Sequence, residues 1–332
     1  HRLGANEAPP AIIGAFIGTQ LEHMLNAIEE GIGEGPLSPD DKTALKLEIG
    51  RIPEVLLDNT DRNRTSPFAF TGNKFELRAV GSTANCAVPM TVLNTIVADQ
   101  LESFKVAVDA RIEGGDKKDD AILKELQKLI IACKPIRFEG NGYSQEWVEE
   151  AARRGLNNLR TTPEALEVLT RPEVIDLFER MQVLRPEELH ARVEVDLEGY
   201  LLKREIEQRV LLNMARNTIL PAAIGYSNTL IANIQGVESV LGAAGASHTV
   251  AQRELLERVG AAMQRVHGLA AELESLHHAA ESLPTALDRA KSVSNHVVPK
   301  LAELGAACSE LERWVDDAVW PLPKFSELLF TR

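Results

Sequence analysis

Three charged side chains at every second position, Lys74, Glu76 and Arg78, have the types and spacing needed to bind a charged substrate. They follow Gly72-Asn73, a pair that favours a two-residue hairpin turn because both residue types tolerate positive φ angles. In a strand after that turn the three side chains share one face, since side chains alternate with a period of two. Arginine and lysine bind phosphate and carboxylate oxygens, and a carboxylate is a ligand for hard cations such as Mg²⁺. The stretch could therefore hold a phosphate group, a carboxylate or a divalent metal.

Two short strands on either side of the turn would position these side chains. The predicted register pairs Thr71 with Lys74, Phe70 with Phe75, Ala69 with Glu76 and Phe68 with Leu77. This register gathers the apolar side chains on the face opposite the charges: Phe68, Phe70, Phe75 and Leu77. Pro67 lacks an N–H group, so the pairing beyond Phe68 is unreliable.

The charged face has two interpretations. If it is exposed, it is a solvated ladder of charges on a hairpin, and the pattern alone favours this interpretation. If it is buried, its charges must be paired or bound to something, because an uncompensated buried charge costs several kcal/mol or more.

The order of four short motifs resembles that of the glutamine synthetases. Asn63-Arg64-Thr65-Ser66 is similar to the family's Asn-Arg-Ser run, Lys74-x-Glu76-x-Arg78 to its Arg-x-Glu-x-Arg strand, and Ala84-Asn85 to its Ala-Asn-Pro helix start. The segment from His1 to Pro9, with Arg2-Leu3 and Glu7-Ala8-Pro9, is similar to the family's flap but one residue shorter. The sequence from Phe68 to Glu76 is most similar to the type III branch of the family. The same branch also has a stretch of about fifty residues between the flap and the Asn-Arg run.

The resemblance implies a role for each matching residue. Arg2 would bind the substrate glutamate, Glu7 would close the flap and help deprotonate ammonium, and Arg64 would contact the ATP phosphates. Lys74 would also approach phosphate, Glu76 would ligate a metal, and Arg78 would bind substrate or the transferring phosphoryl group. One departure stands out: Ala69 occupies the place where many family members carry a second arginine.

The reaction implied by this resemblance is ATP-dependent ligation of ammonia to L-glutamate through a γ-glutamyl phosphate. Glutamate, ammonium and ATP would be the substrates, and Mg²⁺ or Mn²⁺ the metal. The family forms ringed homo-oligomers, dodecamers by resemblance, with active sites between subunits. Its remaining metal ligands, and a small β-domain that supplies an aspartate to the neighbouring site, would precede the flap. His1 falls inside the flap motif and is not a methionine, so we interpret the chain as the second half of a longer one.

Composition limits the remaining possibilities. The chain has 332 residues, a formal net charge of -13, and 44% hydrophobic and 26% charged residues, which is ordinary for a globular protein of one large or two smaller domains. The negative charge argues against nucleic acid or an anionic membrane as a general partner. Cys86, Cys133 and Cys308 are far apart without a CxxC motif, which favours reduced thiols in the cytoplasm. The apolar run over 11–17 is too short to span a bilayer.

The resemblance, together with the helical periodicity of the second half of the chain, implies an α+β protein. We expect residues 1–205 to form the C-terminal part of a glutamine synthetase catalytic domain, a sheet backed by helices, with helical insertions at 11–57 and 105–135. One helix is expected from Ala8 to Ile28 and another from Ala84 to Phe104. Residues 206–332 are expected to form a helical bundle with a docked C-terminal tail.

Two 3.5-residue apolar repeats, joined at Pro284, predict an antiparallel coiled-coil hairpin in that bundle. Leu269 and Leu301 are expected in its seam, and Ser247 as the N-cap of its first helix. We also expect Pro221 to interrupt the preceding helix and Pro299 to kink the second helix of the hairpin. His267, His277 and His278 lie on the first of these helices, where a solvated face is favoured over metal binding.

Two rival functions remain open. The chain could be a non-catalytic helical interaction module on a decayed ligase core, or a ligase that joins glutamate to another amine. The set of Arg2, Glu7, Arg64, Glu76 and Arg78 argues against a decayed core, which need not keep all five.

Overall fold

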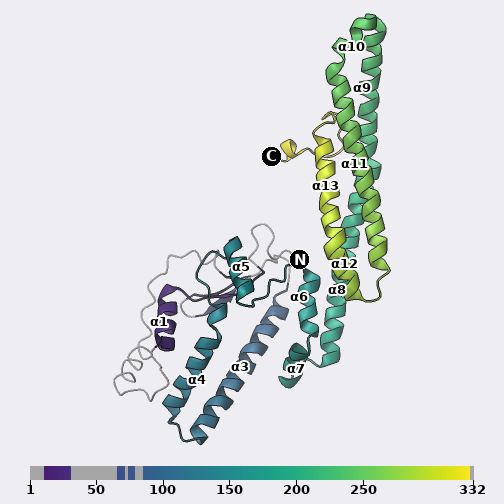
Figure 1. Cartoon of the computed structure of the whole chain (residues 1–332). Coiled ribbons are helices and arrows are strands. Elements are labelled where there is room, and N and C mark those ends of the chain that lie inside the picture. Colours follow the sequence, from purple (N-terminus) through teal and green to yellow (C-terminus); the bar gives the residue numbers. More distant parts are fainter. Residues whose placement is uncertain (1–10, 31–65, 72–73, 79–84, 330–332) are drawn as a thin grey trace. The chain divides into compact units, whose positions relative to one another are not determined.

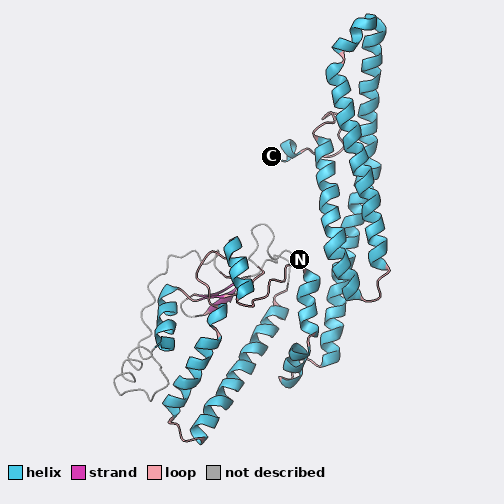
Figure 2. Cartoon of the chain, in the orientation of Figure 1, coloured by secondary structure: helices cyan, strands magenta, loops and turns pink. Residues whose placement is uncertain are grey.

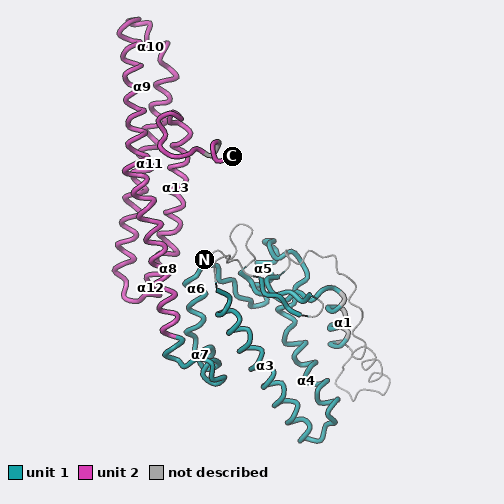
Figure 3. The backbone as a smooth tube through the Cα atoms, turned by 180° about the vertical axis from the view of Figure 1, so that it is seen from behind, with its two compact units in different colours: residues 1–189 teal, residues 190–332 magenta. Residues whose placement is uncertain are grey.

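A computed structural model describes residues 11–30, 66–71, 74–78 and 85–329 of the chain (Figure 1). Helices dominate these residues, and the strands form one small sheet (Figure 2), which confirms the α+β prediction. The chain divides into two compact units, His1–Leu189 and His190–Arg332 (Figure 3). The expected boundary between residues 205 and 206 lies inside helix α8 (Pro186–Met214) and stays a prediction.

The sheet of the first unit has the strand order β1-β2-β3, with β1 at Ala15–Phe16, β2 at Phe68–Phe70 and β3 at Phe75–Leu77. β2 and β3 are antiparallel with the predicted register, so that Ala69 pairs with Glu76. β1 joins the other side of β2 in parallel, and Phe16 pairs with Ala69. On the far side of β1, Arg137 forms an isolated parallel bridge to Ala15.

The prediction of one helix from Ala8 to Ile28, and of a helical insertion beginning at residue 11, is wrong for residues 11–18. Helix α1 begins only at Thr19 (Thr19–Glu30), after Gly18 with its φ of 89°. The apolar spacing before Gly18 fits a helix, but pairing with β2 decides the local conformation and buries Phe16 to 2% exposure. The remainder of the 11–57 insertion beyond Glu30 lies outside the described residues.

Two long helices follow the sheet: α3 (Ala87–Glu113) and α4 (Lys118–Ala132), which pack against each other (Figure 1). Helix α3 does not end near Phe104, because nothing breaks the helical sequence before Gly114-Gly115. Gly115, with φ of 100°, allows the turn between them. Most residues of the segment 105–135 are therefore helical, and that this segment is an insertion stays a prediction.

Shorter helices complete the first unit: η2 (Lys134–Ile136), α5 (Gln145–Arg153), α6 (Thr162–Glu167), η3 (Val168–Thr170) and α7 (Pro172–Arg180). Ser144 caps α5, accepting a hydrogen bond from the Trp147 N–H at 3.2 Å. Trp147 is 3% exposed and stacks on Phe138 with ring centroids 3.6 Å apart, next to Ile12. This small core ties α5 to the segment that leads into β1.

The second unit consists of long helices. Helix α8 continues through a π-helical turn, η4 (Ala215–Ile219), into α9 (Leu220–Leu241), and the short η5 (Gly242–Ala244) and α10 (Gly245–His248) lead to α11 (Val250–Glu281). The chain then reverses into α12 (Ala286–Ser292), a second π-helical turn η6 (Val293–Val297), α13 (Val298–Glu312) and the short α14 (Phe325–Leu328).

The interruption predicted at Pro221 and the kink predicted at Pro299 both fall next to one of these π turns. Each proline lies at the start of the helix that follows a π turn, α9 or α13. Proline lacks the N–H that an α-helix would use and its ring crowds the preceding turn, so a wider turn lets the chain continue without breaking.

Helices α11 and α13 pack side by side and run in opposite directions (Figure 1), as the predicted hairpin requires, whereas its coiled-coil character stays a prediction. Its seam differs by a few positions from the prediction. Leu269 and Leu301 are only half-buried, whereas Ala270 and Leu304 are 0% exposed. Ser247 does not cap α11, which begins after the buried Thr249.

The C-terminal segment docks at its beginning. Trp320 is 8% exposed, and the Lys324 ammonium donates to the Val315 carbonyl at 2.9 Å. Leu328 and Leu329, by contrast, are 54% and 80% exposed.

Candidate active site

The structure describes half of the predicted site. Arg2, Glu7 and Arg64 lie outside the described residues. Lys74, Glu76 and Arg78 lie in or beside β3, at one edge of the sheet as far as the structure describes it. The hairpin and its charged face can therefore be tested, whereas the roles expected for the flap residues stay predictions.

The hairpin closes as its sequence predicts. The Thr71 N–H donates to the Lys74 carbonyl at 2.8 Å, next to the turn. The pairing also extends one step beyond Phe68, because the Arg78 N–H donates to the Pro67 carbonyl at 2.7 Å. Pro67 cannot donate a hydrogen bond but can accept one, so the proline does not end the ladder. This bond fixes the backbone of Arg78 relative to β2.

The aromatic face forms as predicted. The rings of Phe68 and Phe75 stack with centroids 4.8 Å apart, and Phe70 lies 5.2 Å from Phe75. Phe75 is 47% exposed, so the described residues cover this face only in part. Cross-strand aromatic pairs of this kind stabilise the hairpin and hold β3 in register.

The charged face is a half-buried ladder, intermediate between the two interpretations of the sequence. The Glu76 carboxylate lies 3.3 Å from the Lys74 ammonium and 3.7 Å from the Arg78 guanidinium. Exposure of the side chains falls from 61% at Lys74 to 39% at Glu76 and 24% at Arg78. Lys74 is thus an exposed surface cation, whereas Arg78 is largely enclosed.

Arg78 has unused hydrogen-bonding capacity. Its Nη1 atom is buried and has no hydrogen-bond partner among the described residues. A guanidinium with a buried, unpaired nitrogen loses hydration without compensation, unless an anion or water completes it. Of the three charged residues on this face, Arg78 is therefore the best placed to bind a carboxylate or phosphoryl oxygen.

The neighbouring positions on the same face are apolar and buried. Ala69 is 0% exposed and Phe16 is 2% exposed, and they pair across the sheet toward Glu76. A methyl group therefore fills the place where many glutamine synthetases carry a second arginine. A phosphate contact from that position is absent from this hairpin.

The described carboxylates do not fit a divalent metal site by themselves. No three His, Cys, Asp or Glu side chains gather in a metal-binding arrangement among the described residues. Glu76 is one carboxylate, and two cations already contact it. A site for Mg²⁺ or Mn²⁺ needs several oxygen ligands, so Glu76 could supply only one of them.

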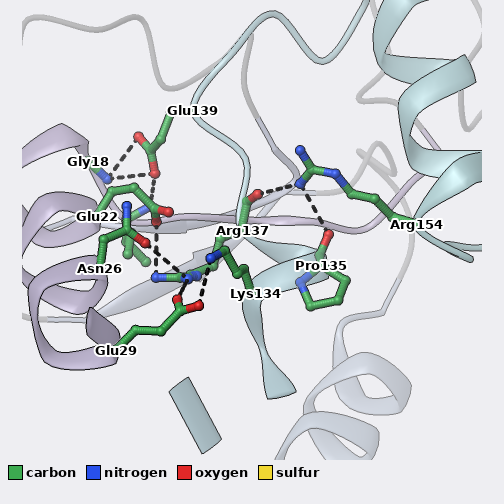
Figure 4. Close-up of polar contacts among 10 residues, drawn as sticks. Gly18, Glu22, Asn26, Glu29, Lys134, Pro135, Arg137, Glu139 and Arg154 are labelled. Atoms are coloured by element: carbon green, nitrogen blue, oxygen red, sulfur yellow. Dashed lines mark hydrogen bonds and ion pairs between the residues drawn. The ribbon is translucent and has the colours of Figure 1, made fainter. Parts of the chain in front are cut away.

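A buried polar cluster around Arg137, which the sequence did not reveal, anchors the other edge of the sheet (Figure 4). The Arg137 side chain is 4% exposed and lies between Glu22 at 3.5 Å and Glu29 at 3.7 Å, both on α1. It also donates to the Asn26 side chain at 3.4 Å, and Lys134 pairs with Glu29 at 2.7 Å. One buried cation facing two carboxylates binds α1 to the strand-like segment beside β1.

Glu139 strengthens the same junction from two residues further on. Its carboxylate accepts hydrogen bonds from the N–H groups of Ile17 and Gly18 at 3.0 and 3.1 Å, just before α1 begins (Figure 4). Arg154 donates to the carbonyls of Arg137 and Pro135 at 3.0 and 3.3 Å. The only sequence signal was the alternation Arg137-x-Glu139 before a glycine-rich turn. This cluster positions β1, and through β1 it supports β2 and the hairpin.

Comparison with known proteins gives matches of two kinds. The family model of the glutamine synthetase C-terminal domain matches residues 121–238, from α4 into α9. The whole chain also aligns with proteins named glutamine synthetase: it is 44% identical over 333 residues to one from Bacteroides fragilis and 33% identical over 337 residues to one from Butyrivibrio fibrisolvens. It is 35% identical over 339 residues to the type-3 glutamine synthetase of Dictyostelium discoideum.

These alignments cover all of this chain but only 46%, 46% and 45% of the respective relatives. The chain therefore spans less than half the length of the curated relatives it matches. The family-model match does not include the hairpin, which only the full-length relatives cover. No helix among the described residues has both the length and the apolar character needed to cross a membrane.

Proposed function

Since this chain is related along its whole length to the glutamine synthetases, type 3 included, we propose that it forms part of a ligase that joins ammonia to L-glutamate. The observation that carries the proposal from the family to this chain is the hairpin. The predicted strand register is present, and it places Arg78, with an unpaired buried nitrogen, beside Glu76 and Lys74. A decayed core would have no need to keep that arrangement.

In the proposed reaction, the γ-carboxylate oxygen of glutamate attacks the γ-phosphorus of ATP. The new O–P bond replaces the bond to the bridging oxygen, and ADP leaves. Ammonia, formed when ammonium loses a proton, then attacks the acyl carbon. The C–N bond forms, the C–O bond to phosphate breaks, and the nitrogen gives its surplus proton to the departing phosphate, so that glutamine and inorganic phosphate are released.

The residues of this chain would act on the charges that develop in these steps. Arg78 would hold the transferring phosphoryl group or the substrate carboxylate, using the nitrogen that is unpaired in the hairpin. Lys74 would turn from Glu76 to a phosphate oxygen, which its 61% exposure permits. Arg64 would contact the ATP phosphates, Arg2 would bind glutamate and Glu7 would accept the ammonium proton, as the resemblance implies.

The metal requirement limits what this chain can do by itself. We propose Glu76 as one ligand of a Mg²⁺ or Mn²⁺ site whose other ligands lie outside the described residues. When bound, such an ion would neutralise charge on the polyphosphate. The ion pairs of Glu76 also give it a second task, holding Lys74 and Arg78 in position.

The experiment uses the longer protein that contains this chain. Arg78→Gln should lower kcat/KM for glutamate about 10²- to 10³-fold, the usual effect of removing one donor to a developing anion. Arg153→Gln is the matched control, because Arg153 is 75% exposed in the same unit and lies on α5, outside the hairpin. Equal activity of the Arg78 and Arg153 variants would refute the proposed role of Arg78.

Glu76→Gln tests the metal role separately. The variant should need a much higher Mg²⁺ or Mn²⁺ concentration while its circular dichroism spectrum stays unchanged. An unchanged metal titration would leave Glu76 with only its positioning task.

Two rivals make different predictions. A glutamate–amine ligase would release phosphate faster with another amine than with ammonium, which a screen of amines detects. A non-catalytic module would release no phosphate with any of them. We also propose that the longer protein forms oligomeric rings and is located in the cytoplasm. Measuring the size of the longer protein in solution tests whether it forms such rings.

A further inference from the structure

The second unit contains a cavity of about 170 Å³ between α8, α11 and α12. Leu201, Ala280 and Val293 contribute apolar surface, and the remaining lining is polar: Arg204, Glu205, Gln208, His277, Glu281 and Arg289. Engineered cavities of about 150 Å³ bind a molecule the size of benzene, so the space suffices for a small ligand.

The polar lining interrupts an apolar interface at a single level. The inward positions of α8 are buried and apolar before and after it, at Leu197, Tyr200 and Leu212, but Arg204 and Gln208 occupy the positions between. On α11, His277 lies in the same way between the buried Leu273 and Ala280. His277 is only 17% exposed, which corrects the expectation that it lies on a solvated face. Polar side chains at these positions add no packing energy to the helix interface, and burying them costs free energy unless they are hydrogen-bonded.

Two of these polar groups are buried without a partner. Gln208 is 3% exposed, and its Oε1 atom has no hydrogen-bond partner among the described residues. The Nε atom of Arg204 is also buried without a hydrogen-bond partner among the described residues, although the Nη1 atom of Arg204 donates to Glu207 at 2.5 Å. Buried polar groups left unsatisfied destabilise a fold. Their convergence on one cavity indicates that something else satisfies them.

The charges in the cavity favour an anion. Both carboxylates of the lining are already paired: Glu205 with Arg209, and Glu281 with His277 and His278 at 3.2 Å each. The Arg289 guanidinium, by contrast, has no ion pair with any described residue, and Arg204 keeps its free Nε. The unused capacity is thus cationic, together with one acceptor, Gln208 Oε1.

We propose that this cavity is a binding site for a small anion, a carboxylate or phosphate that also carries a hydrogen-bond donor. The anionic oxygens would bind Arg204 and Arg289, and the donor would reach Gln208 Oε1. Since α8, α11 and α12 all line the cavity, a bound anion would hold the three helices together at this level. The site belongs to the second unit and does not depend on the ligase proposal.

The test uses the 332-residue chain with inorganic phosphate and L-malate as separate probes, and sodium chloride at matched ionic strength as the reference. Either probe should raise the melting temperature above the reference. Phosphate alone would identify a phosphate site, and malate alone a carboxylate site. Arg289→Met and Gln208→Leu should each weaken binding by about tenfold or more in calorimetric titration, as expected for one lost hydrogen bond to a charged group.

Two control variants test whether the anion binds in this cavity and not elsewhere on the chain. Arg265→Met removes a guanidinium that is 59% exposed and pairs with Glu310 on the outside of the same hairpin, and it should bind like the parent chain. Arg78→Gln removes the cation of the β2–β3 hairpin, where weak phosphate binding is also expected, and should keep the binding that Arg289→Met weakens. If Arg78→Gln abolishes binding and Arg289→Met does not, the anion binds at the β2–β3 hairpin and the proposal fails.

Gln208→Leu provides a readout that does not need the ligand. Without an anion, this variant should melt at a higher temperature than the parent, because leucine continues the apolar interface of α8. A lower melting temperature, combined with no response of the parent to either probe, would mean that water alone satisfies these groups, and would overturn the proposal. If Gln208→Leu fails to fold, Arg289→Met still decides, since Arg289 is only partly buried.

Discussion

At the scale of single residues, two arginines on one sheet show how surroundings separate support from binding. Arg137 is 4% exposed between two carboxylates and an amide, so its charge is used to join α1 to the sheet. Arg78 is 24% exposed with one carboxylate at 3.7 Å and one buried nitrogen without a described partner. The Nε and Nη1 atoms of Arg137 also lack a hydrogen-bond partner among the described residues, so the difference rests on charge and access. Two carboxylates face the enclosed Arg137, whereas only one faces the more exposed Arg78, which leaves Arg78 the better placed to bind a substrate. The local pattern alone does not distinguish them, because both lie in an Arg/Glu alternation, and only the motif resemblance pointed to Arg78.

Cys308 gives the first prediction. The thiol is buried in α13, and burial raises its pKa to about 11. Because the thiolate is the reactive form, Cys308 should not react with a thiol reagent at about pH 8 in the folded chain. Cys86 and Cys133 are exposed and should react. The variant Cys86→Ser/Cys133→Ser should therefore give no label until denaturant is added, and labelling of the folded variant would contradict the burial.

At the scale of elements, the sequence predicted structure that depends on neighbouring residues better than structure that depends on residues distant in the chain. The hairpin register was predictable, because a two-residue turn and alternating side chains fix it within a short stretch. Strand β1 was missed, because its partner Phe68 is distant in sequence and the apolar residues before Gly18 fit a helix as well as a strand. The seam was misplaced between Leu269 and Ala270 for a related reason. Val259, Val266 and Leu273 are buried at the seven-residue spacing that a heptad requires, but the buried position between the last two is Ala270, four residues after Val266, and not Leu269, three residues after it.

That seam gives the second prediction. Leu273 is 0% exposed, so Leu273→Ala should lower the free energy of unfolding by about 2–5 kcal/mol. Leu269→Ala makes the same chemical change at a half-buried position of the same helix and should cost clearly less. Urea denaturation of both variants measures the difference. Equal losses of stability, or a larger loss for Leu269→Ala, would mean that Leu269 lies in the seam as the sequence predicted.

The contact between α3 and α4 gives the third prediction, which concerns Glu125 of α4. This carboxylate is 10% exposed, and hydrogen bonds from Arg111 and Lys128 lower its pKa below the usual 4.5. A lowered pKa in the folded state contributes stability that is present above pH 4.5 and is lost as the pH falls through the folded value. Glu125→Gln should therefore be less stable than the parent at about pH 7, by about 1–3 kcal/mol.

The pH dependence distinguishes this role from packing. The stability difference between the parent and Glu125→Gln should shrink as the pH is lowered below 4.5, because the parent loses the same charge. Asp109→Asn is the control, since Asp109 is half exposed in its pair with Lys105 and such pairs contribute about 0–1 kcal/mol. A difference that does not change with pH would assign Glu125 to packing alone.

At the scale of the whole molecule, sequence motifs and the fold each supply part of the functional argument. The order of motifs was enough to predict a resemblance to the glutamine synthetases, and the whole chain aligns with proteins of that name. The cluster at Arg137 and the cavity beside Gln208 could not be predicted, because each depends on side chains from elements distant in sequence. Composition and periodicity describe one element at a time, and such sites exist only where several elements meet.

The last prediction concerns catalysis by the 332-residue chain alone. Its cations are largely in place in the sequence at Arg2, Arg64, Lys74 and Arg78, so the isolated chain should bind phosphate or polyphosphate weakly. Its described carboxylates do not assemble a metal site, and the curated relatives are more than twice its length. We therefore expect the isolated chain to release no phosphate with glutamate, ATP and ammonium. The longer protein that contains it should be active and oligomeric.

Both polypeptides should be assayed under the same conditions, with Arg78→Gln in the longer protein as the control for turnover at the proposed site. A well-folded isolated chain, shown by cooperative melting, would make its inactivity informative. If the isolated chain instead turns over at the rate of the longer protein, the metal ligands must lie among its own residues, in the segments around Arg2, Glu7 and Arg64 that the structure does not describe. The carboxylates to test next would then be Glu7, Asp58 and Asp61, because they lie in those segments beside the basic residues that would hold the phosphates.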